Sequence, residues 1–137
     1  LSFEGETGPY LQYAVVRANN IFHKLQEREG LSEGDVIRLL DETATAELAE
    51  DEIWALCFEA SRLDDVLEQV VRALEFSVLA KYAFGLAQMF NAFYHRYPIL
   101  AEERADRKRW RAAAVQYVRL QLTRVLDLMG IEVPARM

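Results

Sequence analysis

Apolar residues recur along this chain at the three- and four-residue spacing typical of helices. They do not alternate with polar residues over a length that would predict a strand. The first stripe consists of Leu11, Ala14, Ala18, Ile21, Phe22 and Leu25. We therefore expect a helix that starts near Gly8-Pro9, with Thr7 as its cap, and ends at Gly30.

Five further segments have the same spacing. They cover about residues 32–41, 51–60, 64–74, 78–96 and 101–129. Ser77 is the expected cap of the helix at 78–96, Pro98 breaks the chain after it, and Gly130 ends the last helix. The pattern predicts an all-α bundle of five or six helices, in which short connections favour antiparallel neighbours.

Composition narrows the class of protein. A chain of 137 residues is enough for one domain. It has no apolar run of about 18 residues and no basic leader before an apolar segment, so we expect neither a membrane span nor a signal peptide. One cysteine, Cys57, excludes an intramolecular disulfide and favours a reducing, cytoplasmic setting. With only two histidines, we expect no metal site.

The charge is unevenly distributed. The net charge is −6, but residues 27–75 carry 15 acidic and 4 basic residues, whereas residues 96–137 carry 9 basic and 5 acidic ones. A basic last third can attract phosphate although the whole chain is acidic. Two solvated helix faces would give the same pattern.

The sequence predicts no catalytic residue. Cys57 lies in an apolar stripe with Trp54 and Phe58, where a cysteine is usually part of the core. The two histidines, His23 and His95, are far apart in the sequence. Phosphate-binding glycine loops and Glu-x-x-His pairs are both absent from the sequence.

Aromatic and basic residues suggest binding instead. Tyr94 and His95 lie at the end of a predicted helix, where a tyrosine can stack on an unpaired base. Tyr10, Tyr13 and Arg17 share one face of the first helix, away from its apolar stripe. A tyrosine at the protein boundary and a polar edge of the bundle remain the alternative interpretations of these two groups.

Two segments resemble a known family. LSFEGETGPYLQY, at residues 1–13, is similar to the motif that joins the catalytic and anticodon-binding domains of arginyl-tRNA synthetases. It continues with Ala14-Val15-Val16-Arg17, which keeps the alanine and arginine of the family's Ala-His-Ala-Arg but not its histidine. LAQMFNAFYHRYPIL, at residues 86–100, and the ending LDLMGIEVPARM also resemble this family, with Ala135 in place of the usual glutamate.

The resemblance implies an all-α anticodon-binding domain of the DALR type, which binds the anticodon stem-loop of arginine tRNA and reads its middle cytosine. By position in the motifs, Tyr94 and Met137 would contact an anticodon base, and Tyr10, rather than Tyr13, would be the tyrosine of the junction motif. Arg111 and Arg119 match basic positions of the last helix, which we expect to meet the RNA backbone or base edges.

The domain organisation follows from the same resemblance. Because the chain opens on Leu1 and closes on PARM, we expect the C-terminal part of a longer protein. Residues 1–7 would end a linker from the catalytic domain, and residues 8–137 would form the anticodon-binding domain. We expect no cofactor in this part, with ATP and magnesium in the parent enzyme, no membrane partner, and a monomer that docks on its own catalytic domain.

Two other functions remain open. A protein-interaction bundle would present a contiguous apolar patch on the acidic helices to a basic partner. A small-molecule-binding bundle would have an interior pocket lined by Cys57 and Trp54.

Overall fold

The computed structural model describes residues 7–41 and 50–137, and within these ranges it contains six helices. They are α1 (Thr7–Glu29), α2 (Glu33–Asp41), α3 (Asp51–Ser61), α4 (Leu63–Ala73), α5 (Phe76–Arg96) and α6 (Ala105–Leu128). The predicted all-α bundle is confirmed. No helix of the described residues is long and apolar enough to cross a membrane.

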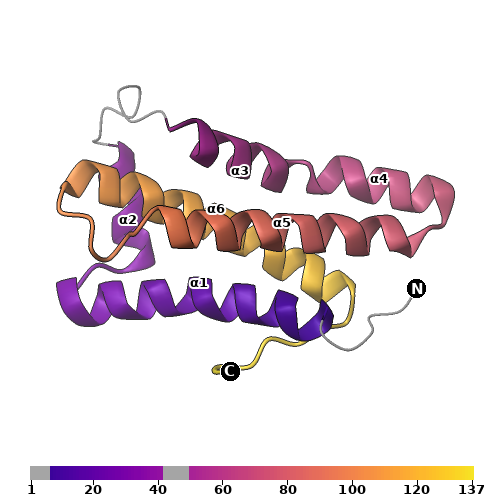
Figure 1. Cartoon of the computed structure of the whole chain (residues 1–137), viewed down its shortest axis with the longest axis horizontal. Coiled ribbons are helices and arrows are strands. Elements are labelled where there is room, and N and C mark those ends of the chain that lie inside the picture. Colours follow the sequence, from indigo (N-terminus) through magenta and orange to yellow (C-terminus); the bar gives the residue numbers. More distant parts are fainter. Residues whose placement is uncertain (1–6, 42–49) are drawn as a thin grey trace.

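Helices α1, α5 and the α3–α4 pair run along the long axis, while α6 crosses behind α5 (Figure 1). α5 and α6 both contact α1 and α3, so these two helices form the centre of the bundle. The predicted stripe of α1 is buried throughout, from Leu11 to Leu25. It meets fully buried α5 residues, among them Ala83, Leu86 and Phe90.

The glycines end their helices as the sequence predicts. Gly130 has a φ of +72°. Its own N–H donates to Asp127 O, and the N–H of the next residue, Ile131, donates to Leu126 O. This pair of bonds is a Schellman motif, which only a left-handed residue can close. Gly30, with a φ of +66°, ends α1 through a bond from its N–H to Gln26 O.

Several predicted boundaries were wrong. α6 begins at Ala105 rather than near residue 101, because Glu102 accepts hydrogen bonds from Arg104 N–H and Arg111 and so belongs to a loop. Ser77 is not a cap, since α5 already begins at Phe76. Thr7 is the first helical residue rather than a cap, so the expected linker at residues 1–7 otherwise lies outside the described residues.

α3 and α4 lie end to end, and their junction is held by the two central helices. The Tyr82 hydroxyl of α5 donates to Glu59 O at 2.6 Å, and the Gln121 amide of α6 donates to Ala60 O at 2.8 Å. Together with Arg62 N–H, which donates to Glu59 O at 3.2 Å, these side chains pair carbonyls in the last turn of α3. The helical backbone is therefore interrupted after Ser61 while these carbonyls keep their hydrogen-bond partners.

Not every apolar stripe is buried as expected. Trp54 and Phe58 on α3 are 50% and 68% exposed, and Val71 and Leu74 at the end of α4 are 72% and 86% exposed. Along the common direction of α3 and α4 the two pairs are roughly 20 Å apart, at a rise of 1.5 Å per residue. These four residues therefore do not form one contiguous patch of the kind expected of a protein-interaction bundle.

Leu74 gives a prediction about stability. Its φ is +54°, a left-handed conformation that strains a residue with a Cβ, and its side chain contributes little burial. We expect Leu74→Gly to raise the free energy of unfolding by about 0.5–1 kcal/mol, measured by urea denaturation.

Leu120→Gly is the matched control. Leu120 is also exposed, at 56%, but lies within α6, where glycine costs about 1 kcal/mol. If Leu74→Gly destabilised the domain as Leu120→Gly does, the strain at Leu74 would be disproved.

Candidate nucleic-acid interface

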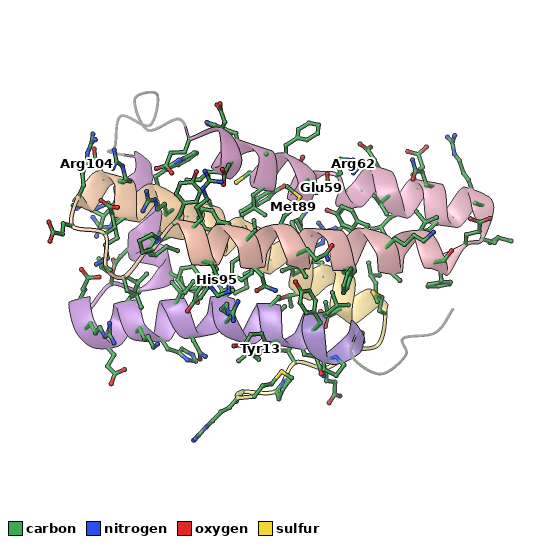
Figure 2. All side chains as sticks on the ribbon, in the orientation of Figure 1. Tyr13, Glu59, Arg62, Met89, His95 and Arg104 are labelled. Atoms are coloured by element: carbon green, nitrogen blue, oxygen red, sulfur yellow. The ribbon has the colours of Figure 1, made fainter. Side chains whose placement is uncertain are left out.

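Arg17 of α1 occupies the seam between α1 and α5. Its guanidinium carbon lies 4.5 Å from the ring centroid of Tyr13 and 4.5 Å from that of Tyr94. One cation thus contacts two aromatic rings from different helices, which is a favourable cation–π arrangement. Figure 2 shows Tyr13 on α1 and His95 on α5 along this seam.

Hydrogen bonds fix the guanidinium in place. Arg17 Nη2 donates to the Tyr13 hydroxyl at 2.9 Å, and Nη1 donates to Asn91 Oδ1, also at 2.9 Å. His95 Nε2 lies 3.5 Å from Nη1. Tyr13 and Arg17 are four residues apart on α1, as are Asn91 and His95 on α5, so helical spacing places each pair on one face. The result is a pre-ordered cluster of aromatic and hydrogen-bonding groups.

A cavity of about 150 Å³, here called the seam cavity, opens beside this cluster. Its lining includes Tyr13, Arg17 and Tyr94, together with the C-terminal residue Met137 and the exposed polar residues Asn20 and Lys24. Three segments distant in the sequence therefore meet here, and all of the named residues can contact a flat, polar ligand.

The C-terminal tail reaches this cavity by crossing α1. Gln12 Nε2 donates to Glu132 O at 2.7 Å, and Ile131 and Val133 pack partly buried against the core. Met137 itself is 56% exposed. The anchored tail thus places a thioether at the rim, where sulfur contacts aromatic rings favourably.

Tyr10 does not join the cluster. Its ring is partly buried and lies 5.0 Å from the ring of Phe84, and Tyr10 does not line the seam cavity. Of the two tyrosines, the structure thus brings Tyr13, three residues further along α1, to the seam cavity.

Arg111 is a buried structural residue, which corrects its expected role at an RNA surface. Its side chain is 7% exposed and forms ion pairs with Glu50 at 3.2 Å and Glu102 at 2.9 Å. It also donates to Pro98 O at 2.8 Å. With these three partners, Arg111 holds the loop between α5 and α6 and is not free to meet RNA.

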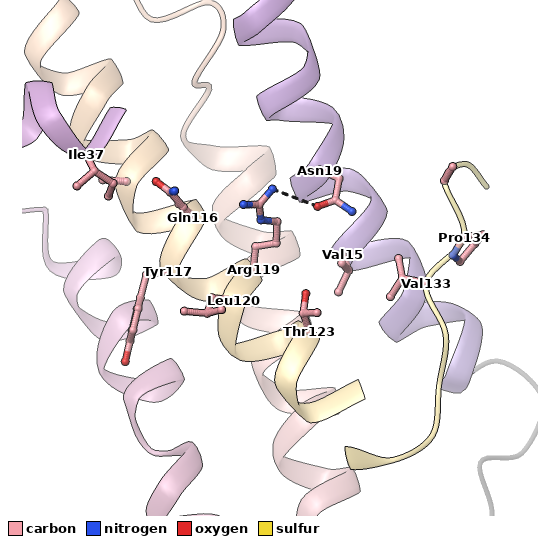
Figure 3. Close-up of a pocket in the computed structure, with 12 residues that line it drawn as sticks. Val15, Asn19, Ile37, Gln116, Tyr117, Arg119, Leu120, Thr123, Val133 and Pro134 are labelled. Atoms are coloured by element: carbon pink, nitrogen blue, oxygen red, sulfur yellow. Dashed lines mark hydrogen bonds between the residues drawn. The ribbon is translucent and has the colours of Figure 1, made fainter. Parts of the chain in front are cut away.

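Arg119 lies in a different groove, shown in Figure 3. This groove, of about 710 Å³, runs between α1, α6 and the tail, and Arg119 there bonds to Asn19 and pairs with Glu33. Burial lowers its pKa. The structure does not bring Arg119 together with Tyr94.

The small-molecule interpretation finds no support in these cavities. Neither Cys57 nor Trp54 lines the seam cavity or the groove at Arg119. Burial raises the pKa of the Cys57 thiol to about 11, which disfavours the nucleophilic thiolate. Among the described residues, no three His, Cys, Asp or Glu side chains gather as metal ligands would.

Sequence reasoning missed Asn91 and Lys24. Lys24 follows Arg17 by seven residues, a helical repeat that could have indicated its place on the same face. Asn91 gave no such signal, because a neutral amide in a helix is usually solvated and only the packing of α1 on α5 gives it a partner.

This chain is similar to known proteins over nearly its whole length. A family model described as the DALR anticodon binding domain matches residues 11–137. The arginine–tRNA ligases of Alkaliphilus metalliredigens and Pyrococcus abyssi are 34% and 38% identical over 99% and 100% of this chain. The chain spans 22% and 21% of these relatives, about a fifth of their length.

The fold also matches a solved structure. Thermus thermophilus arginyl-tRNA synthetase superposes with a TM-score of 0.77 at 28% identity, covering 99% of this chain and 22% of that one. The similarity thus concerns a single domain of a much longer enzyme.

The buried ion pairs of Arg111 give a prediction. Arg111→Met leaves Glu102 without its cation and Glu50 with only the longer pair to Arg107, so we expect the free energy of unfolding to fall by about 3 kcal/mol in thermal or urea denaturation.

Arg72→Met provides the comparison, because Arg72 pairs with Glu68 while 77% of its side chain is exposed. Its loss should cost less than about 1 kcal/mol. Equal losses in the free energy of unfolding would show that the ion pairs of Arg111 stabilise the fold no more than an exposed pair does.

Proposed function

This chain belongs to the DALR anticodon-binding domain family, and we propose that it binds the anticodon stem-loop of arginine tRNA as the tRNA-recognition part of an arginine–tRNA ligase. The observation that carries the proposal is the meeting of Tyr13, Arg17, Tyr94 and Met137 at one cavity.

The chemistry of the cavity suits an unpaired base. A tyrosine ring offers a stacking surface worth about 1–3 kcal/mol per base. Asn20 carries both a hydrogen-bond donor and an acceptor at the lining, and can therefore meet the edge of a cytosine. Among the described residues, Arg17 and Lys24 have no carboxylate partner, so their charges remain available to phosphate.

Arg17 limits how a base can enter. Its guanidinium already covers one face of Tyr94 and one face of Tyr13. A base must therefore stack on the outer face of a ring or displace the guanidinium from between the two rings. Displacement would free a planar cation to bind phosphate or a base edge.

The remaining parts of the proposal concern the longer protein. In it, a catalytic domain would join arginine to tRNA using ATP with magnesium, and residues 8–137 would form the domain that docks on it. We propose that this enzyme acts as a monomer in the cytoplasm. ATP and magnesium would act in that catalytic part.

A titration tests anticodon reading. We expect the chain to bind an arginine anticodon stem-loop more tightly than one whose middle cytosine is replaced by uracil, in fluorescence anisotropy. Affinity for both should fall as salt rises, because phosphate contacts release counterions. Equal affinity for the two loops at both salt concentrations would contradict the proposal.

Substitution of Tyr94 tests the site itself. We expect Tyr94→Ala to weaken binding of the cytosine loop by about 1–3 kcal/mol through loss of stacking. Tyr117→Ala is the matched control, because Tyr117 is an exposed tyrosine that lines the separate groove at Arg119. If both variants bound as tightly as the unchanged chain while remaining folded, the base site would lie elsewhere.

A further inference from the structure

A second cavity lies next to the seam cavity, and it is here called the loop cavity. Its volume is about 330 Å³, and it is bounded by the end of α5 and by residues 98–101 of the following loop. Tyr94, Ile21 and Leu100 line both cavities. The two cavities are therefore neighbours that share a wall, and Tyr94 is the aromatic part of it.

The loop cavity and the seam cavity share Tyr94 but differ in the residues around it. Arg17, whose guanidinium lies over the Tyr94 ring, and Tyr13 line the seam cavity and not the loop cavity. A base in the loop cavity can reach Tyr94 without moving Arg17.

The loop side of the cavity is held in position from α6. Arg111 Nη1 donates to Pro98 O at 2.8 Å, and Lys108 Nζ donates to Leu100 O at 3.2 Å. Ile99, between them, is 5% exposed and packs into the core. The wall thus exists before a ligand arrives, so binding there does not bear the entropy cost of ordering the loop.

The lining selects the chemistry of the occupant. Apart from Tyr94, it is made of aliphatic side chains, Pro98, the partly buried Tyr97 and the exposed imidazole of His95 at the rim. It contains no carboxylate and no lysine or arginine, which disfavours a metal ion and a phosphate. A flat, neutral ring with hydrogen-bonding edges fits such a lining, and the cavity has about twice the volume of the seam cavity.

We propose that the loop cavity binds a second unpaired nucleobase, the neighbour along the strand of the base held in the seam cavity, so that Tyr94 lies between two successive bases. The inference rests on the proposed function, because it needs an RNA loop in the seam cavity. It adds a separate binding site, whose lining does not include Arg17.

The test uses stem-loops in which the nucleotide on one side or the other of the middle cytosine is made abasic. One of these two loops should bind the unchanged chain roughly 5- to 150-fold more weakly, the factor that corresponds to loss of one stacked base. Equal affinity of the intact loop and both abasic loops overturns the second site.

Ala101→Trp then places the effect in the cavity. Ala101 is exposed at its rim, so a larger side chain can fill the cavity without entering the core. Ala101→Trp should weaken binding of the intact loop by about the same factor. It should not weaken binding of the affected abasic loop any further. Ala101→Leu should show a smaller loss of the same kind, and it serves if the tryptophan variant fails to fold.

Ala73→Trp is the matched control, because Ala73 is exposed at the end of α4 and lines neither cavity. It should bind every loop as the unchanged chain does. Equal losses on the intact and abasic loops with Ala101→Trp overturn the second site. Loss of cytosine preference in the unchanged chain overturns the proposed function instead, and absence of any binding overturns both.

Discussion

The close contact of α1 with α5 is the constraint on which the candidate site depends. Ala14 and Ala18 of α1 and Ala83 and Ala87 of α5 are all fully buried. Small side chains let two helix backbones approach, and their larger neighbours then fill the space on either side. A bulkier residue at Ala18 would strain the core directly next to Arg17, because a tightly packed interior does not absorb added volume. The core packing thereby fixes the spacing of the site.

The polar cluster follows from the helical phase of these same residues. On α1, Tyr13 and Arg17 each precede a buried alanine by one position, so they lie on the edge of the helix rather than at its centre. On α5, Tyr94 follows the buried Phe93 and occupies the corresponding edge. Because the two edges face each other, the guanidinium meets both rings at 4.5 Å. The contact of the Arg17 guanidinium with both rings is therefore a geometric consequence of the packing of α1 on α5.

Helical spacing and the terminating glycines were enough to predict an all-α bundle of five or six helices and the buried face of α1, because both depend on nearby residues. The environment of Arg111 could not be predicted in this way, since its partner Glu50 lies 61 positions away and only the fold brings them together. The choice between Tyr10 and Tyr13 had the same difficulty. Both lie on one side of α1, and only the fold shows that Tyr10 meets Phe84, whereas Tyr13 shares Arg17 with Tyr94.

The same distinction bears on the RNA surface that we propose for this acidic chain. The basic run at the start of α6 promised phosphate contacts, yet Arg107 and Arg111 pair with Glu50, and Lys108 pairs with Glu29. These carboxylates come from the acidic part of the chain, so the fold pairs several cations of the basic run with acidic residues distant in the sequence. Arg17, by contrast, is held by neutral oxygens of Tyr13 and Asn91. Its positive charge is therefore held in position but not neutralised. Such a cation beside aromatic rings attracts a nucleotide through both its phosphate and its base.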